Sequence, residues 1–376
     1  MLRNKGVVST GVRTPIIREG DDLVEIVVNS VLNTTFSGSS IKMGSTGKWL
    51  ERKNYDLSDR DVIGITESVI ARAAGFYVTV DEIADYIVKN YSKKDIILLN
   101  PIYSRNRFSM ILKAVARAAD KQVVIYMPDF DEVGNPRGVN PFTGVDIEAY
   151  YREIVENEGK ECKVYHSSAA PVHTAEFLTI YCGLHDYQSW KKFYGNEHRI
   201  TLADICSDRN PDFGLLGTNK STEEKLKLFP TKEMATKICE QVKEKIKEKT
   251  DANVYVCSYG DGCFKSLVGE IWECADPTTM PGYTNPEIFE STPNEIKIKA
   301  FADDEFKELS GYELDEAVRK KISEKNGSLV GNMASQGTTP RLYRDIIASI
   351  MDLTSGSGDK GTPVVLLQGY FDNYSD

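Results

Sequence analysis

The stretch "DIILLNPIYSRNRFSMILKAVARAADKQVVIYM", residues 95–127, decides the fold class. It opens with a short apolar run, continues with apolar residues at helical spacing, and closes with a second apolar run. Short apolar runs are typical of buried strands, and apolar residues repeating at intervals of three and four are typical of an amphipathic helix. The succession therefore predicts a strand, a helix and a strand, which are parallel if the two strands are neighbours.

The residues before this stretch also alternate between strand and helix patterns. Residues 6–17 favour a strand, residues 19–32 carry apolar residues at helical spacing, and residues 59–75 predict a strand that runs into a helix. A further helix is predicted at residues 79–91, because Thr79 and Glu82 have the spacing of a capping box. Alternating strands and helices are typical of a layered α/β domain.

The rest of the chain predicts two further regions. A polar stretch at residues 128–146 precedes helices that extend to about Asn196. The patterns that follow predict strands at 198–205, 253–262, 294–302 and 364–369, and helices at 231–249, 313–325 and 340–353. We therefore expect three regions, namely residues 1–97, an inserted or elaborated α/β subdomain at 98–198, and residues 199–376.

Composition narrows the class of protein. The chain has 376 residues, a formal net charge of −10 and a pI near 5.2. A nucleic-acid binder needs clustered Lys and Arg to neutralise phosphates, so this charge argues against one. No run of residues has the length and apolar character of a signal peptide or a membrane span, which predicts a cytoplasmic protein. The seven cysteines are scattered without a C-x-x-C pair, so we expect reduced, buried thiols.

The stretch "SGSSIKMGSTGKWLERKN", residues 37–54, superficially resembles a phosphate-binding P-loop. The P-loop pattern is G-x-x-x-x-G-K-[ST]. Counting back from Gly47 and Lys48, Lys42 takes the place of the first glycine and Trp49 the place of the hydroxyl residue. The pattern therefore fails, and the stretch is interpreted as a Gly/Ser surface loop.

Three other loops combine acidic, amide and glycine residues. The first contains Asp204, Asp208 and Asn210, the second contains Asp261, and the third is "SGSGDKGTP" at residues 355–363. Carboxylates at strand ends, beside glycines that let phosphate approach the backbone, are what a Mg²⁺- or Mn²⁺-nucleotide site needs. Asp and Gly also simply populate turns, so each loop alone is ambiguous. Together the three loops favour a nucleotide site.

A different site is suggested by Asp129 and Asp131, which form a D-x-D after the strand predicted at 121–127. Phosphatases with an aspartyl nucleophile carry such a pair. That fold places its nucleophile near the start of its core domain and needs a matching lysine and acidic pair downstream. Neither feature is clear in this chain, and the D-x-D is not retained as a site.

The chain resembles the γ-glutamyl ligases that extend coenzyme F420 precursors. The resemblance covers "TPIIREGDDLVEIV" joined to "LSDRDVIGITESVIARAAG", then "LADICSDRN", "VYVCSYGDGCFK" and "DIIASIMDLTSGSGDKGTPVVLLQG". Each motif is weak alone, but their order along the chain is specific. The resemblance implies a two-lobed, mixed α/β (α+β) ligase-like fold, in which segment 98–198 is longer than in the family. In that segment Arg105 and Arg107 fit either bidentate binding of a carboxylate or phosphate, or capping of a helix start.

The resemblance also implies functional residues. Arg72, where the family usually has a lysine, and Lys265 would supply catalytic positive charge. The divalent ions would be held by Asp208, with Asp204 as the competing choice, and by Asp261. The residues implied to contact the nucleotide are Thr14, Pro15, Ile16, Ile17, Glu67, Ser68, Arg72, Asn210, Gly356, Ser357, Asp359 and Gly361.

The reaction implied by the resemblance is amide formation through an acyl phosphate. The expected co-substrate is GTP or ATP with Mg²⁺ or Mn²⁺, and K⁺ is a further candidate ion. The expected substrates are L-glutamate and a carboxylate-bearing acceptor, either an F420 precursor or a folate-like molecule. The family implies a homodimer, with no nucleic-acid or membrane partner. The alternative is a non-catalytic nucleotide-binding or sensing protein on the same scaffold.

Overall fold

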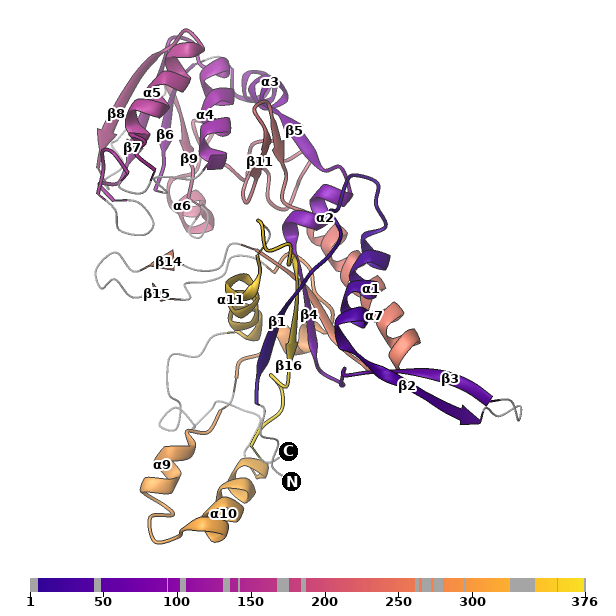
Figure 1. Ribbon diagram of the computed structural model, residues 1–376. Helices are drawn as coiled ribbons and strands as arrows, with labels where there is room; N and C mark the ends of the chain where they lie inside the picture. Colours follow the sequence, from indigo (N-terminus) through magenta and orange to yellow (C-terminus); the bar gives the residue numbers. More distant parts are fainter. Residues whose placement is uncertain are drawn as a thin grey trace.

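The protein has a mixed α/β fold whose two main sheets lie in different lobes (Figure 1). A computed structural model describes residues 6–43, 49–92, 94–101, 106–130, 136–140, 143–167, 176–183, 187–260, 264–265, 272–273, 280–293, 295–324, 342–356 and 358–374. The mixed α/β class expected from the alternating sequence patterns is confirmed.

The first lobe is built on a four-stranded sheet in the order β1 (Val8–Val12), β16 (Val364–Gln368), β4 (Val62–Thr66) and β13 (Tyr255–Tyr259). The pairs β1–β16 and β16–β4 are antiparallel, whereas β4 and β13 are parallel. Strands β4 and β13 are buried along their whole length. Burial on both faces explains why both strands are nearly continuous apolar runs.

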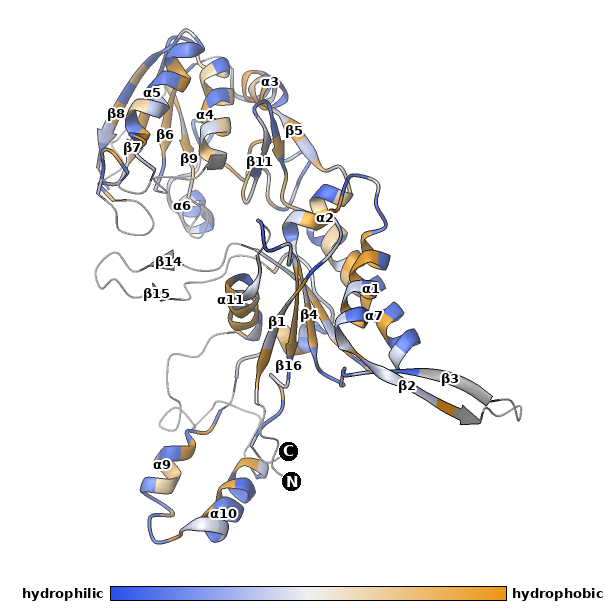
Figure 2. Cartoon of the chain, in the orientation of Figure 1, coloured by the Kyte–Doolittle hydropathy of each residue, from blue (hydrophilic) through white to orange (hydrophobic). Residues whose placement is uncertain are grey.

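Helices cover both faces of this sheet. Helices α1 (Leu23–Thr35), α2 (Glu67–Ala73) and α7 (Lys232–Thr250) share one hydrophobic core with one face. Helices α8 (Pro286–Phe289) and α11 (Tyr343–Thr354) share a second core with the other face. Figure 2 shows hydrophobic residues on the central strands and on α1 and α11. The first lobe therefore has three layers, with the sheet in the middle.

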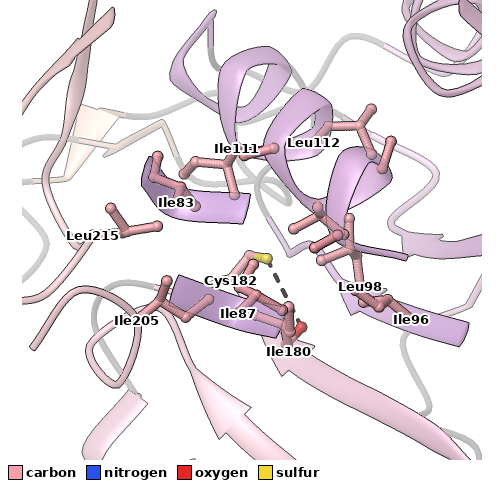
Figure 3. Packing of buried hydrophobic residues seen from close by; sticks show 14 of the residues in the cluster. Ile83, Ile87, Ile96, Leu98, Ile111, Leu112, Ile180, Cys182, Ile205 and Leu215 are labelled. Carbon is pink, nitrogen blue, oxygen red and sulfur yellow. Dashed lines mark hydrogen bonds between the residues drawn. The ribbon is translucent and has the colours of Figure 1, made fainter. Parts of the chain in front are cut away.

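The second lobe is built on a five-stranded parallel sheet. Its order is β10 (Arg199–Thr201), β9 (Phe177–Tyr181), β6 (Asp95–Leu99), β7 (Gln122–Met127) and β8 (Glu161–His166). Helices α3 (Val80–Tyr91), α4 (Asn106–Ala118) and α5 (Ile147–Asn157) pack on one face, in the core that Figure 3 shows in part. The other face packs on α6 (Tyr187–Tyr194). The predicted parallel β6–α4–β7 unit is confirmed.

Smaller elements complete the chain. A three-stranded sheet of β11 (Asn219–Thr222), β12 (Lys225–Lys227) and β5 (Tyr77–Thr79) packs beside α3 and α4 of the second lobe (Figure 1). Strands β14 (Phe264–Lys265) and β15 (Trp272–Glu273) pair with each other. Helices α9 (Ile298–Asp303) and α10 (Gly311–Ser323) contact each other, and Lys321 of α10 lies over the ring of Phe301 of α9.

Residues 37–54 do not form the expected loop. They belong to an antiparallel hairpin of β2 (Phe36–Met43) and β3 (Trp49–Tyr55), which projects from the first lobe (Figure 1). The ladder pairs Ser39 with Lys53 and Ile41 with Glu51. Backbone pairing does not need apolar side chains, so small polar residues do not prevent a two-stranded ribbon from forming. The loop interpretation was therefore wrong, and the rejection of the P-loop pattern does not depend on it.

Two other sequence-based expectations were also wrong. The region up to Asn196 was expected to be helical, but it contains β8 and β9 as well as α5 and α6. Short apolar runs such as that of β9 fit a buried helix or a buried strand equally well, and here neighbouring strands complete the ladder. Residues 294–302 were expected to form a strand, but Ile298–Asp303 is helical and packs on α10. The alternating pattern there is only three pairs long.

The expected domain limits stay a prediction. The second sheet begins at Asp95 and ends at Thr201, so the limit expected at 97–98 falls within β6. Its core also includes residues of α3 and residues 202–228. The five cysteines in the described ranges, namely Cys162, Cys182, Cys206, Cys239 and Cys257, are buried and form no disulfide, as expected. Every helix of the described part is too short or too polar to cross a membrane.

Glu82 joins α3 to the segment that follows β10. Its carboxylate accepts from the backbone N–H of Thr79 at 2.7 Å, and the hydroxyl of Thr79 accepts from the N–H of Glu82, which confirms the predicted capping box. Arg209 donates to the other carboxylate oxygen at 2.8 Å. The Arg209 guanidinium, against a smaller opposing effect of burial, lowers the pKa of Glu82 from 4.5 to about 2.

This lowered pKa predicts a pH dependence. Because the folded pKa lies below the unfolded value, the stability from ionised Glu82 is complete above about pH 4.5 and is lost as the pH falls towards 2. We expect Glu82→Gln to lower the free energy of unfolding at pH 7 by less than about 1 kcal/mol, because the ion pair is partly exposed. Urea titrations of both proteins from pH 7 to pH 3 check this, and a difference that stays constant over that range would contradict it.

Candidate active site

Four segments of the chain meet at one edge of the four-stranded sheet. The parallel strands β4 and β13 both end there, because Thr66 pairs with Tyr259. Strand β1 ends and β16 begins at the same edge, because Val12 pairs with Val364, which in turn pairs with Ile65. The segments that follow β1, β4 and β13 and the turn before β16 therefore leave the sheet side by side.

The turn at residues 356–363 holds these segments together. Gly356 and Thr362 bridge its base, and Gly361 accepts a backbone hydrogen bond from Thr14 at 3.2 Å. The carbonyl of Pro363 accepts from the backbone N–H of Thr66 at 2.9 Å and from the hydroxyl of Tyr259 at 3.3 Å. One turn thus contacts the ends of three strands. Burial raises the pKa of Tyr259, which keeps its hydroxyl protonated as a donor.

A buried ion pair lies just beyond the end of β4. Glu67, the first residue of α2, accepts from Lys227 of β12 at 2.8 Å, and the two side chains are only 6 % and 7 % exposed. Asn219 of β11 donates to the other oxygen of Glu67 at 3.2 Å. A Cβ added to Gly260 would lie 2.6 Å from the Cγ of Glu67, so the chain after β13 passes close against this side chain. Only glycine fits at that position without displacing Glu67.

The other residues expected at this edge surround the ion pair. Thr14 is half-buried, Ile16 is exposed and Ile17 is buried. The segment continues to Gly20, whose N–H donates to the carbonyl of Ala73 at the end of α2. Helix α2 itself carries Ser68, which is half-buried, and Arg72, which is exposed. Pro15 is exposed between Thr14 and Ile16, and Asp359 is exposed in the turn before β16.

In the acidic segment after β10, the two candidate metal ligands Asp204 and Asp208 have different surroundings. Asp204 accepts from Lys191 through one oxygen and from the N–H and hydroxyl of Thr201 through the other. Burial alone would raise the pKa of Asp204, but the bonds from Lys191 and Thr201 outweigh it and hold the pKa below its usual value. Asp208 is exposed. Both oxygens of Asp204 are thus already used, whereas the carboxylate of Asp208 faces solvent.

Asn210 is fully buried and holds this segment in place. Its side-chain nitrogen donates to the carbonyl of Phe229 at 2.8 Å, and its oxygen accepts from the N–H of Phe213 at 3.2 Å. The segment then reaches the start of α7, where Asp212 accepts from the N–H of Lys232 at 2.8 Å. Asn210 therefore has a structural role, and its contact with a nucleotide stays a prediction.

Part of the predicted site lies outside the described residues. Asp261 and Ser357 fall in such gaps, as does Arg105, and the side chains of Lys265 and Arg107 are not described. Within the described ranges, no three His, Cys, Asp or Glu residues are grouped closely enough to hold a metal ion. Asp129 of the D-x-D pair forms an exposed ion pair with Arg137 at 3.5 Å.

Sequence reasoning missed two partners of the site. Lys227 lies in "KLKLF", where alternation predicts that a lysine between two leucines is exposed to solvent. Asn219 stands in a short polar strand with no apolar pattern. The buried partner of Lys227 is Glu67, which lies 160 residues away in sequence, so the pair leaves no local signal.

The arrangement fits the binding of a phosphorylated ligand. Backbone groups of residues 14–17 and of the turn at 356–361 border the edge, and Arg72 is exposed on α2, which begins directly after β4. The negative charge of Glu67 is balanced by Lys227, so it repels an incoming anion less than an isolated carboxylate would.

The chain matches a known protein family over most of its length. The model of one protein family, described as F420-0:gamma-glutamyl ligase, matches residues 11–369. The matched range includes every segment that meets at the edge of the four-stranded sheet. No protein with a curated description matches the chain.

The buried ion pair predicts a large loss of stability when one partner is removed. Lys227→Met would leave the Glu67 carboxylate buried without the positive charge of Lys227, so we expect the free energy of unfolding to fall by about 3–5 kcal/mol. The double variant Glu67→Gln with Lys227→Met should recover part of this loss, because no charge then remains buried. Urea unfolding of the three proteins measures both effects.

Lys220→Met is the matched control. Lys220 lies in β11, the neighbour of β12, and it pairs with Glu223 at the protein surface. Its cost should stay below about 1 kcal/mol. Equal losses in the free energy of unfolding for Lys220→Met and Lys227→Met would contradict a larger stabilising role for the buried pair.

Proposed function

Because the chain belongs to the F420-0:gamma-glutamyl ligase family, we propose that it is a nucleotide- and divalent-metal-dependent γ-glutamyl ligase. It joins the amine of L-glutamate to a carboxylate acceptor, either an F420 precursor or a folate-like molecule. The observation that carries the proposal is the meeting of residues 14–17, 67–72, 260 and 356–363 at one sheet edge. These segments are far apart in sequence, and each contains a motif that resembles the family.

In this proposal the nucleotide lies at that edge. Thr14, Pro15, Ile16 and Ile17 border it through their backbone, and Gly356 to Gly361 close over its phosphates. Arg72 is exposed and forms no ion pair with the residues that the structure describes, so in the proposal it neutralises charge on the transferred phosphoryl group. Glu67 and Ser68 lie where α2 begins, directly after the end of β4.

In this proposal one of the two competing aspartates and Asp261 hold the divalent ion. Both oxygens of Asp204 are engaged by Lys191 and Thr201, whereas Asp208 is exposed, which favours Asp208 as a ligand together with Asp261. Mg²⁺ or Mn²⁺ prefers such oxygen ligands and would neutralise phosphate charge when bound. In the same proposal K⁺ is a further ion, and Asp204 positions the segment that carries Asp208.

The proposed reaction has two steps. A carboxylate oxygen of the acceptor attacks the γ-phosphorus of GTP or ATP, the bond to the β-γ bridging oxygen breaks, and an acyl phosphate and a nucleoside diphosphate form. The amine of L-glutamate then attacks the acyl carbon, loses a proton, and expels inorganic phosphate to leave an amide. Arg72 and Lys265 stabilise the negative charge that develops on the transferred oxygens. The proposal places this enzyme in the cytoplasm as a homodimer.

Release of nucleoside diphosphate that depends on both L-glutamate and an acceptor tests the proposal. We expect Arg72→Ala to lower kcat/KM by about 100- to 1,000-fold, since a positioned donor to developing charge contributes on that scale. Arg72→Lys should retain part of the activity because it keeps the charge but loses the planar donor geometry. Arg137→Ala is the control, because Arg137 is exposed in the other lobe and pairs with Asp129.

Asp261→Asn tests the ion separately from turnover. It should weaken nucleotide binding in the presence of Mn²⁺ and leave binding in its absence unchanged. Nucleotide binding without diphosphate release, across both F420-type and folate-type acceptors, would contradict the ligase and support a non-catalytic binding protein.

A further inference from the structure

The five-stranded sheet reverses its direction of winding between β6 and β9. The chain runs from β6 to β7 and then β8 on one side, and returns to β9 on the other side of β6. After β6 it continues into α4 on one face, and after β9 it continues into α6 on the opposite face. In open parallel sheets the loops diverge at such a point, and ligands bind beyond the carboxyl ends of the two strands.

Asn100 occupies this point directly after β6. Its N–H donates to the carbonyl of Tyr126 at 2.8 Å, so the backbone continues the β6–β7 ladder. Because side chains alternate along a strand, Asn100 lies on the face of Ile96 and Leu98, towards α4. Asn100 is only 2 % exposed, and within the described ranges its side-chain nitrogen is the buried side-chain atom that lacks a hydrogen-bond partner. Buried donors are almost always paired, so an unpaired one indicates a missing acceptor.

The neighbouring strand supplies no acceptor for this nitrogen. Cys182 follows β9, and its N–H donates to the carbonyl of Leu99 at 2.9 Å, so it lies beside Asn100 across the strand pair. Its sulfur points back to the carbonyl of Ile180 at 3.8 Å (Figure 3). A Cβ on Gly183 would lie 2.5 Å from the ring of Tyr181, which keeps the chain after β9 without a side chain there.

The start of helix α4 also favours a ligand with negatively charged oxygen atoms. It begins at Asn106, shortly after Asn100, and runs for 13 residues. The first N–H groups of a helix have no partner within the helix and carry partial positive charge, so they favour an anion. The unpaired donor of Asn100 and the start of α4 thus both favour a ligand with negatively charged oxygen atoms.

We propose that the β6–β9 switch point is a second ligand site, which binds the phosphate or carboxylate group of a small molecule. The side-chain amide of Asn100 donates to one oxygen of that group, and the start of α4 faces another. The site belongs to the five-stranded sheet and is separate from the edge of the four-stranded sheet at which the ligase reaction is proposed. Its existence does not depend on the proposed ligase activity.

Hydrogen exchange of the full chain with two probes, inorganic phosphate and succinate, tests this site. Binding at the switch point should slow exchange in peptides that cover residues 96–101 and 177–183. Slowing by phosphate alone identifies a phosphate-bearing ligand, and slowing by succinate as well identifies a site for carboxylates too. No slowing in these peptides with either probe, or slowing confined to residues 12–17 and 62–69, would overturn the proposal.

Asn100→Leu, which keeps the shape and removes the polar atoms, provides the second test. Without a ligand the variant should melt about 1–2 °C higher than the wild type, because it no longer buries an unpaired donor. It should also lose the effect of both probes on exchange at residues 96–101. Asn210→Leu is the control, because Asn210 is equally buried but bonded through both side-chain atoms, and it should melt lower. A fall in melting temperature for Asn100→Leu as large as that for Asn210→Leu would overturn the proposal.

Discussion

The buried contact between Glu67 and Lys227 joins the first lobe to the three-stranded sheet that packs on the second lobe. Glu67 continues from β4 of the four-stranded sheet, and Lys227 ends β12, which pairs with β5. Strand β5 leads directly into α3 of the second lobe. Removing two charges from water costs several kcal/mol each, and this cost is offset only when the pair is close and its remaining atoms are bonded. The bond from Asn219 to Glu67 meets part of that condition, so the geometry of the junction is tightly restricted.

The same contact has a consequence for chemistry at the sheet edge. A carboxylate at the end of β4 would repel phosphate, but Lys227 balances its charge from the side of the second lobe. Arg72, on the same helix as Glu67, stays exposed and is the cation that the proposal assigns to the nucleotide phosphates. In the proposed ligase, Lys227 therefore lowers the repulsion between Glu67 and the nucleotide phosphates without itself contacting phosphate.

Much of the fold was predictable from local patterns. The β4–α2 unit, the capping box of Thr79 and Glu82, and the β6–α4–β7 unit all follow from periodicity and capping rules, and the structure confirms them. Strands β8 and β9 were missed because what distinguishes them from helices is the neighbouring strand, not their own residues. The hairpin of β2 and β3 was missed because its pairing relies on backbone groups in a sequence rich in Ser and Gly.

The site was only partly predictable from the sequence. The resemblance placed Thr14, Glu67, Arg72 and the turn before β16 in one site, and the register of the sheet brings their segments to one edge. It left open the choice between Asp204 and Asp208, which depends on contacts with Lys191 and Thr201 that no motif encodes. Lys227 and Asn100 were not predicted, because their significance depends on which groups lie opposite them after folding.

The most direct test of this account is a crystal structure of the protein soaked with GTP or ATP and Mn²⁺. The account predicts that the phosphates lie at the edge of the four-stranded sheet, between residues 14–17, Arg72 and the turn at 356–361. It also predicts that Mn²⁺ contacts Asp208 or Asp261, while Asp204 keeps its bonds to Lys191 and Thr201. Phosphates bound away from this edge, or Mn²⁺ bound by Asp204 after release of Lys191, would contradict the account.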